Sequence, residues 1–229
     1  MDSMNLVPYI EDERLFDYAA SCAQTLRPDG RDEGREEARR LKHCFQEITH
    51  CHSLLQRRYE GTARIPAACE WLLDNFYMLQ REYPAVRSTL LKAERQRTVR
   101  GRLLVAELCR ALLQSGHGKL TEERCTAYLA GFQSVTVLQR RELLLFPAAL
   151  RAAIIEAIAA SCRKLSASNE PEALTGELAA LFGSLISLST MDMETLLDNA
   201  DIPNQILAGE ADGSYAKMDR VTKEDYLRR

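Results

Sequence analysis

The segment CEWLLDNFYML (residues 69–79) is the clearest amphipathic stretch of the chain. Its apolar side chains recur with the 3.6-residue period of an α-helix, which places Cys69, Leu72, Leu73, Phe76 and Leu79 on one stripe. The pair Ile65-Pro66 precedes it, and proline is well tolerated in a first helical turn. We therefore expect a helix here that buries one face against other helices.

Similar helical blocks, separated by proline and glycine turns, extend on both sides of this stripe. They cover residues 11–26, 32–59, 103–113, 121–132, 140–165 and 171–185. Thr121 is the expected N-cap of its block, and Pro147 either kinks a long helix or begins a new one. Strand-like alternation is nearly absent, since only residues 134–138 have a β-like composition. The pattern predicts an all-α, multi-helix bundle of roughly eight to ten helices.

Three regions are expected along the chain. Residues 1–66 form an N-terminal helical hairpin, residues 67–188 a core helical region, and residues 189–229 an irregular stretch of short helices and loop. In this last region, prolines and glycines at 203, 209 and 213 separate the helical pieces. A helix beginning at Thr222 is expected to continue beyond Arg229.

Composition limits the class of protein. The 229 residues are 46% hydrophobic and carry a formal net charge of −3, so the chain can bury a sizeable core. This charge lacks the strongly basic balance that non-specific nucleic-acid binding requires, and we predict no nucleic-acid partner. The longest apolar stretch, residues 143–160, is interrupted by Arg151 and Glu156, so no membrane-spanning segment is predicted.

The cysteines and the N-terminus predict a cytoplasmic location. Seven cysteines are spread widely without a C-x-x-C pair, which suits a reducing compartment. The first residues, Met1-Asp2-Ser3-Met4, lead to acidic residues without the basic and apolar regions of a signal peptide.

One cluster contains several residue types that bind metals. It comprises His43, Cys44, His50, Cys51 and His52. A structural zinc ion needs four ligands, whereas one helix brings only two or three of these side chains together. Cys44 and Cys51 share a stripe with Ile48, where free cysteine behaves as a small hydrophobic residue. We predict that the cysteines pack in the core and that the chain binds no metal.

No catalytic motif is present. The chain lacks the Asp-x-Asp pair that holds a cation against a nucleotide sugar, and it also lacks a Walker loop, G-x-G-x-x-G and G-x-S-x-G. We therefore predict no catalytic residue and no cofactor in this chain.

The basic segment 87–102 is expected to be a loop or a short helix. Its arginines at 95, 97, 100 and 102 could clamp phosphates, but a solvated face opposite an acidic neighbour is favoured. The acidic stretch 191–225 is one candidate for that neighbour. Trp71 could stack on a sugar ring, although packing between helices is commoner for a half-buried tryptophan.

A series of short strings along the chain is more specific than periodicity. The string WLLDNFY (71–77) resembles one near the N-terminus of cyclic β-1,2-glucan synthases and related long glycosyltransferase and glycoside-phosphorylase polypeptides. The likeness continues in order through residues 118–123, 128–138, 141–151, 184–192 and 218–226, and covers about residues 67–229. Residues 82–100 depart from the family pattern, and residues 1–66 share only its helical character.

The motif positions that carry the resemblance are expected to be structural. They are Trp71, Asp74, Asn75, Phe76, Gln133, Glu142, Pro147, Arg151, Met218, Asp219 and Tyr226. No catalytic residue of the family maps onto this chain.

The resemblance implies a non-catalytic helical region on the cytoplasmic side of an inner-membrane-associated parent. The catalytic and membrane domains of the same polypeptide would be its partners. That parent would transfer glucose from a nucleotide-glucose donor and trim the glucan with a phosphorylase part. Contact with the glucan itself is left open. The alternative is a self-standing helical protein-interaction scaffold.

Overall fold

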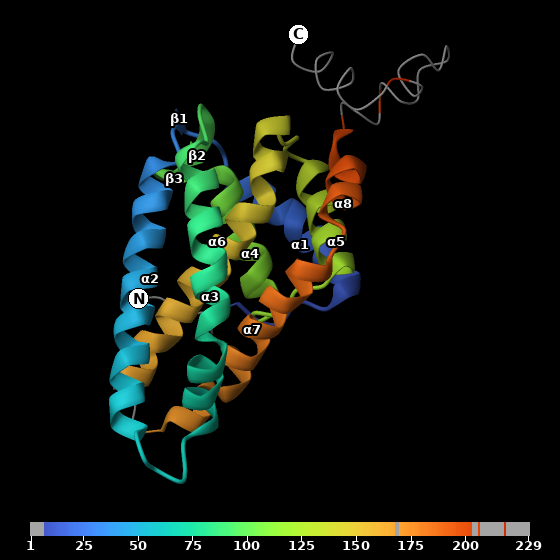
Figure 1. Ribbon diagram of the computed structural model, residues 1–229. Helices are drawn as coiled ribbons and strands as arrows, with labels where there is room; N and C mark the ends of the chain where they lie inside the picture. Colours follow the sequence, from blue (N-terminus) through green and yellow to red (C-terminus); the bar gives the residue numbers. More distant parts are fainter. Residues whose placement is uncertain (1–6, 168–169, 203–205, 207–217, 219–229) are drawn as a thin grey trace.

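The computed structural model describes residues 7–167, 170–202, 206 and 218 (Figure 1). Within these residues the chain forms eight α-helices, a short 3-10 helix and one small sheet, which confirms the predicted all-α multi-helix fold. The helices are α1 (Asp12–Thr25), α2 (Arg35–Tyr59), α3 (Ala67–Leu91), α4 (Leu104–Ser115), α5 (Glu122–Gln133), α6 (Arg140–Ala167), η2 (Pro171–Leu174), α7 (Thr175–Thr190) and α8 (Met193–Ala200).

The helix starts follow local sequence signals. Thr121 caps α5 as expected, because its hydroxyl oxygen accepts a hydrogen bond from the Arg124 backbone N–H at 3.2 Å. Asp192 caps α8 in the same way through Thr195, at 3.1 Å. Pro66 immediately precedes α3. These caps satisfy backbone donors that a helix end would otherwise leave unpaired.

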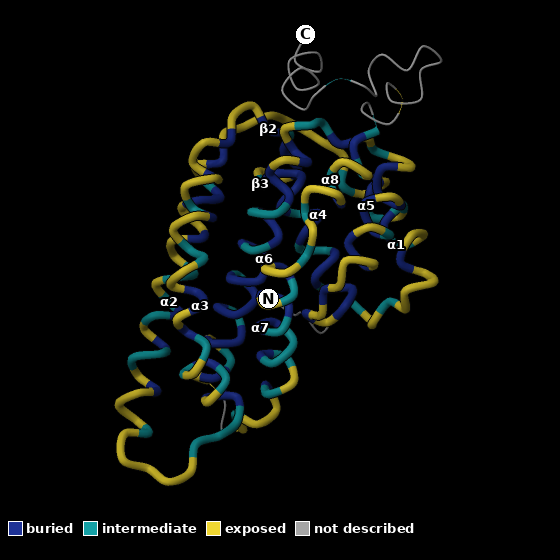
Figure 2. Tube along the Cα trace, turned by 45° about the vertical axis from the view of Figure 1, so that its right-hand side comes forward, coloured by how far each residue is buried: buried dark blue, intermediate teal, exposed yellow. Residues whose placement is uncertain are grey.

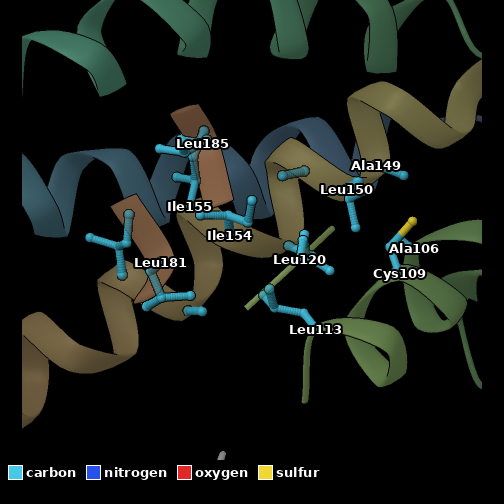
Figure 3. Packing of buried hydrophobic residues seen from close by; sticks show 14 of the residues in the cluster. Ala106, Cys109, Leu113, Leu120, Ala149, Leu150, Ile154, Ile155, Leu181 and Leu185 are labelled. Atoms are coloured by element: carbon cyan, nitrogen blue, oxygen red, sulfur yellow. The ribbon is translucent and has the colours of Figure 1, made fainter. Parts of the chain in front are cut away.

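Helix α6 is the centre of the bundle. It packs against α2, α3, α4 and α7, and Figure 2 shows it buried over most of its length. Figure 3 shows Ile154 and Ile155 lying beside Leu185 of α7, while Ala149 lies near Cys109 of α4. Pro147 lies inside α6, so the residues on both sides of it belong to one long helix.

A three-stranded antiparallel sheet covers one end of the bundle (Figure 1). Its strands are β1 (Gly30–Asp32), β2 (Gln96–Val99) and β3 (Arg102–Leu103), in that order across the sheet. Arg31 pairs with Arg97 and Val99 pairs with Arg102. The expectation of a loop or short helix over residues 87–102 was wrong, because α3 runs on to Leu91 and two strands follow it.

Two helical stretches are long and apolar enough to cross a membrane by length and composition alone, namely α6 and the combined stretch Pro171–Thr190. The core helix of a soluble protein has the same length and composition. In α6, 61% of the relevant window is buried inside the protein. Its Glu142, Arg151 and Glu156 form ion pairs with other elements. Neither stretch is a clear membrane span.

The buried apolar residues of the helices join in one core. Helix α1 packs against α5, whereas α2 packs against α3 and α6. The division at residues 66 and 188 stays a prediction, and most of the region 189–229 lies outside the described residues.

Candidate functional site

The most distinctive chemistry in the structure is a pair of buried ionic clusters that join the sheet to the helices. In the first, Arg97 of β2 donates to Glu142 of α6 through Nε at 2.7 Å and Nη2 at 2.5 Å. The Glu142 side chain is only 1% exposed. It also accepts the Gln139 backbone N–H at 2.8 Å, and Arg97 donates to the Val137 carbonyl at 2.8 Å. A bidentate guanidinium–carboxylate pair is among the strongest side-chain hydrogen-bonding arrangements.

The second cluster surrounds Arg102 of β3. Its guanidinium makes two hydrogen bonds of 2.8 Å to Glu37 of α2 and one of 2.8 Å to Glu156 of α6. Glu107 of α4 lies 3.5 Å from the Arg102 Nε atom. Arg110 binds Glu156 at 3.0 Å and lies 3.3 Å from Glu107. Three carboxylates therefore face two guanidinium groups where α2, α4 and α6 meet the sheet.

Burial of these groups alters their proton affinity. Burial raises the pKa of Glu107 and of Glu156, and Arg102 opposes this rise in both. Burial lowers the pKa of Arg102, but the neighbouring Glu156 and Glu37 outweigh it and the net effect is a rise. The side-chain atom Oε1 of Glu107 is buried without a hydrogen-bond partner. Two further arginines act on these carboxyls: Arg40 opposes the rise in the pKa of Glu156, and Arg100 opposes the rise in the pKa of Glu107.

The sequence indicated only half of these clusters. The arginines at 97 and 102 were expected on a solvated face opposite an acidic neighbour. They do face carboxylates, but the solvated face was wrong for these two, because their side chains are only 17% and 16% exposed. Glu37 lies in a run of charges of both signs (residues 31–42), a pattern that predicts a solvated helix face, yet it is only 4% exposed. That part of the expectation was wrong, because Arg102 compensates the buried carboxylate from a position 65 residues away in sequence. Periodicity within one helix does not reveal such a partner.

The first motif string, residues 71–77, lies on α3 and mostly packs within the bundle. Trp71 is half-buried and stacks on Phe182 of α7, with ring centroids 6.5 Å apart. Asn75 donates a hydrogen bond to the Trp71 carbonyl at 2.9 Å. Phe76 is buried and stacks on His52 of α2 at 4.1 Å, whereas Asp74 is exposed.

The later motif residues join separate elements. Gln133 donates to the Ala200 carbonyl at 2.7 Å and accepts the Leu138 N–H at 3.2 Å, which ties α5 to the end of α8. Arg151 of α6 donates to Glu82 of α3 at 3.1 Å and to the Leu188 carbonyl of α7 at 3.0 Å.

Arg151 also donates to the carbonyl of the motif residue Pro147 at 3.1 Å. The structure therefore does not gather these motif side chains into one site. Met218 is described only as an isolated, partly buried residue, and Asp219 and Tyr226 lie outside the described residues.

The histidine and cysteine cluster of α2 is divided between two environments. His43 and His50 are exposed, whereas Cys51 is buried and donates weakly to the Cys162 carbonyl at 3.9 Å. Burial raises the pKa of the Cys44 thiol to about 12, so this group stays protonated at neutral pH. No group of three or more His, Cys, Asp or Glu side chains among the residues that the structure describes could hold a metal ion.

Replacing Cys44 and Cys51 together by alanine should lower the free energy of unfolding by about 1–2 kcal/mol through lost packing. Elemental analysis should find no stoichiometric zinc in the wild type or in the double variant. One zinc ion per chain that disappears in the double variant would overturn the packing interpretation.

The chain was compared with known proteins. No protein-family model and no curated protein sequence matches this chain.

Proposed function

We propose that this chain is the non-catalytic helical accessory region of a cyclic β-1,2-glucan synthase-like enzyme. The supporting observation is the ordered series of strings that begins with WLLDNFY (71–77) and ends in residues 218–226. In the proposed parent, this region braces the catalytic and membrane domains on the cytoplasmic side. The parent transfers glucose from a nucleotide-glucose donor and trims the product by phosphorolysis.

The placement of the motif side chains is consistent with a bracing role. Gln133, Glu142 and Arg151 each bond to an element other than their own. An active site would bring polar side chains together around open space. The side chains of Gln133, Glu142 and Arg151 instead form hydrogen bonds that join separate elements. A region built in this way presents a fixed surface to its neighbours, which suits a support for catalytic domains.

The direct test of the non-catalytic role is an activity assay on the purified chain. Incubated with UDP-glucose, or with β-1,2-gluco-oligosaccharide and phosphate, the chain should form no glucan and no glucose 1-phosphate. Substitutions at Glu142 and Arg151 serve as the probe for a trace activity. Turnover that survives purification and is abolished by either point substitution would contradict the proposal.

Trp71 tests whether this region touches sugar. Because the indole packs on Phe182, Trp71→Ala should lower the free energy of unfolding by about 3 kcal/mol. The intrinsic fluorescence should be blue-shifted and should not respond to β-1,2-gluco-oligosaccharide. Tyr77→Ala is the matched control, since this aromatic residue of α3 is 60% exposed and its loss should cost little. A saturable fluorescence change with unaltered stability of Trp71→Ala would instead indicate a sugar-binding platform.

A further inference from the structure

The sheet end of the bundle carries an unusual set of exposed side chains. Within residues 27–33, 92–101 and 135–144, six exposed cationic residues face solvent against four carboxylates. The cationic residues are Arg27, Arg31, Lys92, Arg95, Arg100 and Arg141, and the acids are Asp29, Asp32, Glu33 and Glu94. We call this surface the arginine end. Its local excess of positive charge contrasts with the net charge of −3 of the whole chain.

Direct contacts hold these segments together. Arg31 of β1 lies opposite Arg97 of β2, and like charges in such a pair are unfavourable unless one is neutralised elsewhere. Glu142 neutralises Arg97, and the Arg31 side chain is exposed. Arg141 donates to the Arg95 carbonyl at 3.4 Å, so the start of α6 lies beside the start of β2.

The acids within the arginine end are partly engaged. Asp29 accepts the Arg100 backbone N–H at 2.7 Å, and Asp32 accepts the Glu33 N–H at 2.7 Å. Glu33 also pairs with Arg35 at 2.8 Å. Among the residues that the structure describes, none of these acids is paired with a guanidinium group of the arginine end, so these groups can bind an external anion. Most of the acidic stretch 191–225, a candidate neighbour of this segment, lies outside the described residues.

Two arginines of the arginine end have a left-handed backbone conformation, which is commoner for glycine, asparagine and aspartate. Arg95 and Arg100 both have φ of 52°, in the left-handed region that L-residues seldom occupy. Arg100 and Gly101, with φ of 72°, form the two-residue turn between β2 and β3, where asparagine, aspartate or glycine is the usual first residue. An arginine at this position has no backbone reason to be there, which points to a role for its side chain.

Exposed aliphatic side chains lie among these cations. Val135 is 46%, Val137 49% and Leu144 57% exposed. The Val137 carbonyl accepts a hydrogen bond from Arg97, and Leu144 lies one helical turn after Arg141 on α6. A purely polar polyanion would leave these side chains without a partner. The interfacial region of a bilayer accepts both cations and aliphatic groups.

We propose that the arginine end docks on the surface of a bilayer that contains anionic lipid. Guanidinium groups bind the lipid phosphates, and the two valines and Leu144 enter the boundary between headgroups and acyl chains. This inference does not rest on the proposed function, because a scaffold without any glucan-synthesising parent would dock in the same way. The two can therefore fail independently.

Vesicle sedimentation tests the proposal with the whole chain. The wild type should sediment with vesicles of equal parts phosphatidylglycerol and phosphatidylcholine, and not with pure phosphatidylcholine. A triple variant should bind the anionic vesicles on the order of 100-fold more weakly. It combines Arg31→Gln, Arg95→Gln and Arg141→Gln. The control combines Arg14→Gln, Arg57→Gln and Arg64→Gln, which removes the same charge from exposed positions elsewhere and should retain binding.

The variant Arg100→Asn distinguishes an effect on membrane binding from an effect on protein stability. Asparagine suits the left-handed turn, so this variant should be at least as stable as the wild type while binding anionic vesicles several-fold more weakly. The proposal is overturned if the wild type does not sediment with anionic vesicles or if both triple variants lose binding equally. Binding to polyglutamate but not to vesicles would also overturn it, in favour of an acidic protein partner.

Discussion

Replacing Glu142 by leucine should lower the free energy of unfolding by about 3–5 kcal/mol, the usual cost of removing one partner from a buried ion pair. The substitution leaves the Arg97 guanidinium without its two acceptor oxygens and the Gln139 N–H without its acceptor. Leucine fills a similar volume, so the loss reports the unpaired charge more than a cavity. Urea denaturation followed by circular dichroism measures the effect.

The double variant Arg97→Met with Glu142→Leu is the matched control. It replaces both charges by apolar side chains and should recover most of the lost stability, because no charge is left buried alone. If the free energy of unfolding of Glu142→Leu lies within about 1 kcal/mol of the wild-type value, Arg97 is adequately solvated without its partner, and the account is contradicted.

Arg102→Met should produce a comparable loss that depends on pH. Without this guanidinium, Glu37, Glu107 and Glu156 face one another, and Arg110 is the one arginine left that forms ion pairs within the described cluster. Arg40 and Arg100 act on Glu156 and Glu107 without forming such a pair. We expect a loss of about 3–5 kcal/mol at neutral pH. The control is the exposed Arg39, whose ion pair is with Glu36 on the same helix. Arg39→Met should lower the free energy of unfolding by less than about 1 kcal/mol.

The pH dependence follows from the raised pKa values of Glu107 and Glu156. A carboxyl that binds its proton more tightly in the folded state stabilises the protein below its unfolded pKa, and this contribution is lost as pH rises through the folded pKa. Removing Arg102 raises both folded pKa values further. The deficit of Arg102→Met should therefore be largest at neutral pH and shrink as the solution is acidified toward 4.5, the ordinary value for glutamate. An equal deficit at both pH values would contradict the account.

Much of the helical architecture was predictable because its signals are local. The stripe over residues 69–79 is part of α3, and the Thr121 cap begins α5. Such patterns depend on side chains three or four residues apart, which the sequence displays directly. Pro147 left two possibilities open, because a proline inside a helix is tolerated when tertiary packing compensates for the missing N–H.

The small sheet was not predictable for the opposite reason. Residues 96–103 are basic and show no strand alternation, yet β2 pairs with Gly30–Asp32 on one side and with β3 on the other. Arg97 and Arg102 of these strands are compensated by Glu142 and Glu37 on distant helices. The left-handed backbone at Arg95 and Arg100 could not be predicted from residue type either, because neither residue is glycine, asparagine or aspartate. The motif residues were found by resemblance, and their partners became visible only in the fold.

The proposal that this chain is part of a much larger glucan-synthesising polypeptide has a direct test. An antibody raised against residues 67–188 and used on fractionated cells of the source organism tests it most directly. The account predicts a band several times larger than the 25.9 kDa of this chain, in the membrane fraction that forms β-1,2-glucan from UDP-glucose. A single band near 25.9 kDa, separate from that activity, would contradict it and favour the self-standing scaffold.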